Sequence, residues 1–121
     1  MATGKAIGEF SLKSITATIL PGPGGSQLSQ VNWEGTGTGF GASFLTTTFV
    51  GGRDGTFSLN WVSYLENGDG LTGSGQGTYE SIGKNRWRTV NVAEVSDGSR
   101  IRAEGEIDLA ARSWKGTLFE G

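Results

Sequence analysis

The sequence contains no cysteine and no histidine. The absence of cysteine excludes disulfide bonds, iron–sulfur clusters, thiolate zinc sites and thiol nucleophiles. The absence of histidine removes the Ser-His-Asp triad, the commonest metal ligand and the side chain that titrates near neutral pH. Any chemistry must therefore use carboxylates, tyrosine, lysine, arginine or amides, and we expect neither a metal nor another cofactor.

An excess of charge and long apolar runs are also lacking. Ten basic and 12 acidic residues give a formal net charge of -2, which offers no electrostatic reason to bind nucleic acid. No run approaches the roughly 18 apolar residues of a membrane-spanning helix, and Met1 to Lys5 open no apolar segment of signal-peptide length. We therefore expect a cytoplasmic protein without nucleic-acid or membrane partners.

The chain is short of proline but rich in glycine, with 2 prolines and 22 glycines in 121 residues. This length fits a single domain spanning residues 1–121. Both prolines fall in the segment Pro-Gly-Pro-Gly-Gly-Ser at 21–26. Because this segment cannot pair as a regular ladder, we predict a flexible loop there.

Apolar and polar residues alternate along most of the chain, which is typical of strands with one buried face. The segment 55–65 places four large apolar side chains on one face: Phe57, Leu59, Trp61 and Leu65. The segment 100–109 puts small and apolar residues on one face: Ile101, Ala103, Gly105, Ile107 and Leu109. Its charged residues share the other face: Arg100, Arg102, Glu104, Glu106 and Asp108. We expect that charged face to be solvated and to carry opposite-sign pairs.

Turn residues that accept positive φ separate the alternating segments. They include Asn67-Gly68-Asp69-Gly70, Gly83-Lys84-Asn85 and Ser96-Asp97-Gly98, which recur too closely for crossover helices. The pattern predicts an all-β domain, a single closed antiparallel barrel of about eight strands in an up-and-down meander. The expected strands are 5–19, 27–38, 42–51, 55–66, 71–81, 86–95, 99–109 and 113–119. In the first strand the apolar parity switches, which predicts a bulge near Lys13 and Ser14.

Glycine occupies every second position in residues 35–41 and 73–77. Phosphate-binding glycine loops need a helix directly behind them, and alternating strand sequence follows here instead. We interpret these glycines as strand positions that allow sharp coiling or the close approach of a large group from across the barrel. On that basis a side chain at Gly75 should enter space filled by an opposing aromatic ring.

The aromatic residues provide the candidate ligand site. Trp33, Trp61, Tyr79 and Trp87 lie on faces whose other members are apolar or glycine, so we expect them to point into the barrel. Asn91 shares its parity with Trp87, and an apolar cavity with a few polar groups is the usual form of a small-molecule site. A packed core is the structural alternative.

Three segments resemble the glycine-punctuated strands of small bacterial allene-oxide-cyclase-like barrels of unknown function, which are grouped with dirigent proteins. The similarity is one of rhythm within residues 30–82, and the segments are Trp33-Glu34-Gly35-Thr36-Gly37-Thr38-Gly39, Gly52-Arg53-Asp54-Gly55-Thr56-Phe57 and Gly73-Ser74-Gly75-Gln76-Gly77-Thr78-Tyr79. The resemblance implies a closed barrel, homo-oligomers and, in characterised relatives, cofactor-free steering of a reactive hydrophobic intermediate. It transfers no functional residue to this chain.

The leading hypothesis is a barrel that binds a small apolar ligand, with cofactor-free isomerase or cyclase activity as its catalytic form. The alternatives are a carbohydrate-binding module and a structural or assembly protein without a pocket. The positions of the tryptophan rings separate the three. For catalysis, Tyr79 is a candidate proton donor, and Glu94 qualifies as a base only if it points inward.

Overall fold

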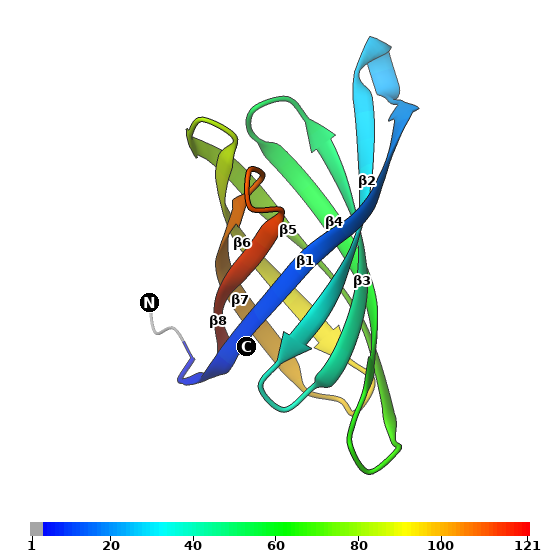
Figure 1. Cartoon of the computed structure of the whole chain (residues 1–121), viewed down its shortest axis with the longest axis vertical. Helices are drawn as coiled ribbons and strands as arrows, with labels where there is room; N and C mark the ends of the chain where they lie inside the picture. Colours follow the sequence, from blue (N-terminus) through cyan, green and yellow to red (C-terminus); the bar gives the residue numbers. More distant parts are fainter. Residues whose placement is uncertain (1–3) are drawn as a thin grey trace.

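The computed structural model describes residues 4–121, which form one closed barrel of eight antiparallel strands in chain order (Figure 1). The strands are β1 (Ala6–Pro21), β2 (Gln27–Gly37), β3 (Gly41–Gly51), β4 (Gly55–Tyr64), β5 (Gly70–Gly83), β6 (Arg86–Val95), β7 (Arg100–Asp108) and β8 (Ser113–Glu120). A single 3-10 turn, η1 (Pro23–Gly25), connects β1 to β2. The predicted fold class is confirmed, and every strand end lies within two residues of its predicted position.

The two ends of the barrel hold different turns. In Figure 1 the upper end carries the β1–β2, β3–β4, β5–β6 and β7–β8 connections, and the lower end carries the other three. Gly68, Asn85 and Gly98 adopt the positive φ that the sequence predicts at hairpin turns. At the β6–β7 turn, Asp97 accepts hydrogen bonds from the backbone N–H and hydroxyl of Ser99. These bonds stabilise the carboxylate and hold the pKa of Asp97 below its ordinary value.

No helix within residues 4–121 has the length and apolarity needed to cross a bilayer.

The predicted bulge in β1 is confirmed, because the register with β2 shifts between Ser14 and Thr16. Beyond the bulge, Asn32 links three strands on the outer surface. Its amide donates to the Thr16 hydroxyl at 2.8 Å and accepts from the Thr46 hydroxyl at 2.7 Å. The bulge therefore reverses the parity of β1 without interrupting its pairing with β2.

The charged face of β7 points outward as predicted and forms cross-strand ion pairs with β6. Arg86 pairs with Glu106, and Arg100 lies 3.6 Å from Glu94. Ile101, Ala103 and Ile107 are buried on the opposite face. Leu109 departs from the predicted pattern, because β7 ends at Asp108 and Leu109 is half exposed in the following turn.

Several strand glycines lie where a neighbouring strand passes too close for a side chain. A Cβ at Gly116 would lie 2.0 Å from the Glu104 carbonyl oxygen, and one at Gly75 would lie 2.3 Å from that of Val92. The expectation that an opposing ring excludes a side chain at Gly75 is therefore wrong, since the backbone of the neighbouring strand excludes it. At Gly73 the obstacle is a ring, because the Trp61 indole lies 2.2 Å from the added Cβ position on the paired strand.

We predict that Gly116→Ala destabilises the barrel by about 1–3 kcal/mol, because the new methyl group forces two backbones apart. Gly83→Ala is the matched control, since its Cβ would meet no atom within 4 Å. Urea unfolding of both variants measures the difference. Equal stability of the two variants would show that β7 and β8 separate at no cost.

Candidate functional site

Two tryptophans fill the middle of the lumen. Trp33 from β2 and Trp114 from β8 are 4% and 2% exposed, and their ring centroids lie 5.3 Å apart. Each indole N–H donates to a buried threonine hydroxyl at 2.9 Å, Trp33 to Thr47 and Trp114 to Thr89. We call Trp33, Trp114, Thr47 and Thr89 the waist. Because a buried indole N–H requires a partner, these hydrogen bonds fix both ring orientations.

We predict that Thr89→Val destabilises the protein by about 1–3 kcal/mol, because it leaves the Trp114 N–H buried without an acceptor at nearly constant volume. Thr78→Val is the control, because Thr78 is exposed on β5. Thermal unfolding followed by near-UV circular dichroism measures both changes. A Thr89→Val protein as stable as the control would mean that the indole finds another acceptor.

Above the waist, aromatic side chains close the upper end of the barrel. Phe49 contacts Phe57 and Tyr79, with centroid distances of 5.3 and 5.2 Å. The Tyr79 hydroxyl lies 3.1 Å from the Gly52 carbonyl oxygen, to which it donates, and the Trp87 N–H donates to the Arg53 carbonyl oxygen at 3.1 Å. Tyr79 and Trp87 therefore anchor the β3–β4 turn over this end.

Burial, followed by the nearby Asp54 carboxylate, raises the pKa of Tyr79 above its ordinary value. The folded state therefore holds this proton more tightly than the unfolded chain does. The resulting stabilisation is present below about pH 10, the ordinary tyrosine pKa, and is lost as the pH rises through the folded-state pKa.

We predict that the free energy of unfolding falls above about pH 10, and that Tyr79→Phe weakens this dependence. Tyr64→Phe serves as the control for the exposed tyrosine. Urea unfolding at a series of alkaline pH values provides the measurement. Identical alkaline profiles for wild type and Tyr79→Phe would exclude Tyr79 as the source.

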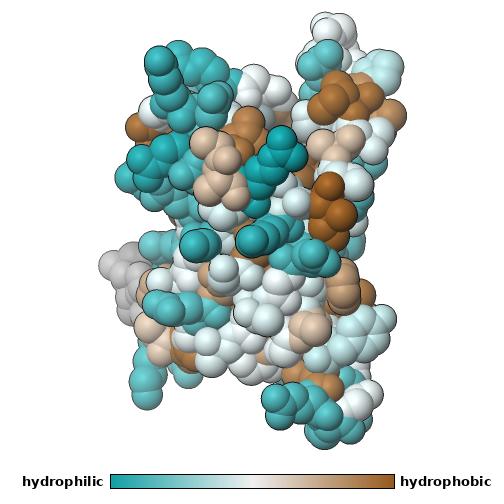
Figure 2. Space-filling view, in the orientation of Figure 1, coloured by the Kyte–Doolittle hydropathy of each residue, from teal (hydrophilic) through white to brown (hydrophobic). Residues whose placement is uncertain are grey.

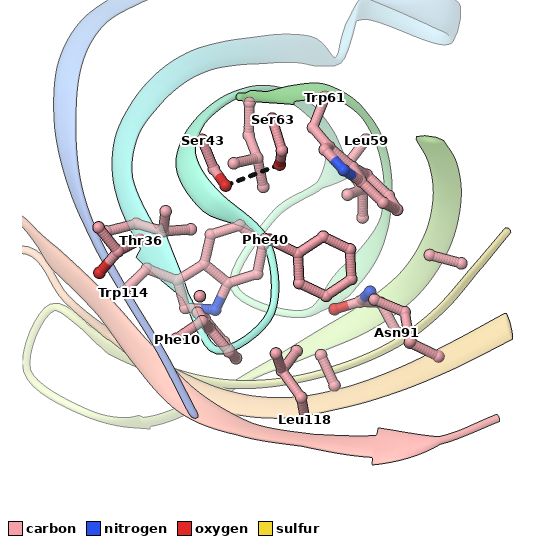
Figure 3. Close-up of a pocket in the computed structure, with 16 residues that line it drawn as sticks. Phe10, Thr36, Phe40, Ser43, Leu59, Trp61, Ser63, Asn91, Trp114 and Leu118 are labelled. Carbon is pink, nitrogen blue, oxygen red and sulfur yellow. Dashed lines mark hydrogen bonds between the residues drawn. The ribbon is translucent and has the colours of Figure 1, made fainter. Parts of the chain in front are cut away.

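Below the waist lies a cavity of about 70 Å³ with a mainly apolar lining (Figure 3). The Trp114 ring bounds it on the side of the waist, and its walls include Trp61 from β4 and Asn91 from β6. The remaining lining residues are Phe10, Leu12, Thr36, Gly37, Phe40, Ser43, Leu45, Leu59, Ser63, Ala93, Ile101, Ala103 and Leu118. None of the lining side chains carries a carboxylate, amine, guanidinium or phenol. The cavity is therefore suited to an uncharged, largely apolar guest.

The polar groups of the cavity differ in their hydrogen bonding. The Ser43 and Ser63 hydroxyls bond to each other at 2.8 Å, and this is the bond drawn among the lining residues in Figure 3. Asn91 is 5% exposed, and its amide forms no hydrogen bond with another lining residue. An amide can both donate and accept, so this buried group is available to a guest molecule.

Phe40 covers the cavity from the β2–β3 turn. Its ring lies near the centre of the lining residues in Figure 3 and contacts Trp61 edge to face, with a centroid distance of 6.3 Å. Gly39 and Gly41 flank it with φ of 80° and 67°, a conformation that side chains other than glycine rarely adopt. Phe40 therefore lies over the lower end of the cavity on a glycine-flanked turn.

The structure separates the five predicted ligand-binding residues. Trp61 and Asn91 line the cavity together, Trp33 belongs to the waist, and Tyr79 and Trp87 lie at the upper end. Glu94, the conditional base, lies on the outer surface beside Arg100 and does not point into the lumen.

Sequence reasoning missed two residues that shape the cavity, Trp114 and Phe40. Trp114 shares its parity with Gly116 and Leu118, and this alternation places it on the inner face. Phe40 stands alone among glycines in a turn, where no periodic signal exists.

Comparisons of the chain with protein-family models, curated proteins and solved structures gave no match. The resemblance to allene-oxide-cyclase-like barrels therefore stays a prediction. Within residues 4–121, no group of three or more acidic side chains gathers in a way that would hold a metal ion.

Proposed function

We propose that this barrel binds a small apolar molecule with one carbonyl or hydroxyl group in the cavity below the waist. The observation that carries the proposal is the Asn91 amide, which lies in a mainly apolar lining and forms no hydrogen bond with another lining residue. A guest that covers this amide without hydrogen-bonding to it would lose about 1–3 kcal/mol. A guest with a carbonyl or hydroxyl group can hydrogen-bond to it and avoid that loss.

The cavity volume sets the size of the ligand. An apolar cavity of about 150 Å³ in another protein takes up benzene, and the present cavity is about 70 Å³. A ring-sized ligand therefore enters only if the Phe40 ring moves aside. Displacing that ring frees the volume of a phenyl group and uncovers one edge of Trp61. One-ring ketones and alcohols, such as monoterpenoids, fit this requirement.

The lining residues favour binding over acid–base catalysis. No titratable side chain reaches the cavity, so a bound molecule meets no general acid or base. Any isomerase or cyclase activity would then arise from holding a reactive molecule in one conformation. A carbohydrate platform has less support, because all four tryptophans are buried or half-buried.

The direct test is a titration of tryptophan fluorescence with one-ring ketones, their parent cycloalkanes and monosaccharides. We expect saturable changes with the ketones, weaker binding of the cycloalkanes and none of the sugars. The ligand should also raise the melting temperature, because it binds the folded state alone. Saturation by sugars alone, or no response from any compound, would contradict the proposal.

Two substitutions test separately the hydrogen bond from Asn91 and the covering ring of Phe40. Asn91→Leu should weaken ketone binding about 2- to 10-fold, the equivalent of one hydrogen bond, and leave cycloalkane binding unchanged. Phe40→Ala should strengthen binding of both by about 2- to 10-fold, because no aromatic contact has to be broken first. Asn60→Leu, the same change on the outer face of β4, is the control.

A further inference from the structure

The barrel leaves one strand edge open beyond its closure. β8 pairs with β1 only from Ala6 to Lys13, and the Ser14 N–H reaches the Arg112 carbonyl. From Thr16 to Pro21, β1 pairs with β2 alone. Figure 1 shows this part of the β1–β2 hairpin projecting past the other hairpins at the upper end. The β1 segment 15–20 therefore has a free edge on the side that faces away from β2.

Backbone groups on this edge point outward. The Gly22 N–H donates to the Ser26 carbonyl, which places the Gly22 N–H on the β2 side. Because successive residues of an antiparallel strand alternate, the N–H groups of Ala17 and Ile19 point to the free edge. Unpaired edge groups of this kind template the addition of another strand.

The side chains along this edge are uncharged and exposed. Ile15 and Ile19 are 52% and 55% exposed, and Leu20 is also exposed. Figure 2 shows apolar residues on this projecting hairpin. Most protein edges carry a lysine, a proline or a bulge as protection. Here the bulge at Ser14 and the proline at 21 bound the segment and leave its interior unprotected.

A comparable edge elsewhere in the barrel is capped. β5 extends past the start of β4, whose Gly55 pairs with Tyr79. The next exposed position on that edge, the Ser81 N–H, donates to the Asp54 carboxylate at 2.8 Å. A side chain from the β3–β4 turn thus occupies this edge. Among residues 4–121, by contrast, no side chain accepts a hydrogen bond from the N–H groups of Ala17 and Ile19.

The sequence of the open edge is symmetric about Ala17, reading Ile15-Thr16-Ala17-Thr18-Ile19 in both directions. When two copies of such a segment pair antiparallel about a two-fold axis through Ala17, each residue meets its equivalent. Ala17 faces Ala17, Thr16 faces Thr18, and Ile15 faces Ile19. Apolar and β-branched cross-strand pairs of this kind stabilise a sheet.

We propose that the open edge of β1 pairs with the same edge of a second copy, which joins two barrels through a continuous sheet. The self-complementary segment favours a second copy over a foreign peptide. The assembly closes at two copies, because pairing consumes the open edge of each chain. A segment this short buries less area than a standard interface, so we expect a dissociation constant on the order of micromolar.

The test is sedimentation of the full chain over a concentration series from about 1 to 500 µM, a range that brackets a micromolar dimer. We expect a monomer–dimer equilibrium for the wild type. Ala17→Lys and Ala17→Glu each place like charges opposite one another at the axis, so each alone should raise the dissociation constant at least about 10-fold. Thr56→Lys adds the same charge to the exposed face of β4 and should leave the equilibrium unchanged.

An equimolar mixture of Ala17→Lys and Ala17→Glu chains is the decisive arm. Opposite charges then meet at the axis, and native mass spectrometry should detect a heterodimer that neither variant forms with itself. A wild type that stays monomeric over the whole series would overturn the proposal. So would a dimer that persists in both variants alone, or an assembly larger than two.

Discussion

Two indole rings pack against each other inside the lumen, and the rest of the interior is arranged around them. An eight-stranded barrel encloses room for side chains and little else. Trp33 and Trp114 take that room at mid-height, and the hydroxyls of Thr47 and Thr89 hold their N–H groups. The waist thereby divides the lumen into two ends, and the cavity lies at the lower one.

The two ends of the lumen differ in the contacts that hold their aromatic side chains. At the upper end the aromatic side chains have backbone carbonyls of the β3–β4 turn within reach, so Tyr79 and Trp87 bond to the protein itself. At the lower end Phe40 contacts Trp61, and its phenyl side chain forms no hydrogen bond. Hydrogen bonds therefore hold the aromatic side chains of the upper end to the β3–β4 turn. Phe40 at the lower end is held by a ring-to-ring contact worth about 0.5–1.5 kcal/mol.

Much of the fold could be predicted from sequence, because alternation and turn chemistry act locally. The switch of parity between Leu12 and Ile15 predicted the bulge, and the turn residues predicted the strand ends. The candidate site was harder to predict from the sequence. All of the predicted aromatic residues lie on the inner face of the sheet. Their position along the barrel axis depends on the stagger of the strands, which the alternation of apolar and polar residues does not encode. The same limit applies to Gly75, since only the closed barrel brings the Val92 carbonyl against it.

The meander topology also determines how the chain reaches its native state. Seven of the eight strand pairings join neighbours in sequence, whereas β1 and β8 meet across nearly the whole chain. Hairpins form from short loops at small entropic cost, but the last pairing must close a loop that spans the domain. Until that step, the edges of β1 and β8 that pair with each other are both exposed, and the open edge of β1 at residues 15–20 remains exposed afterwards. Slow closure at high protein concentration would therefore favour strand exchange between chains over completion of each barrel.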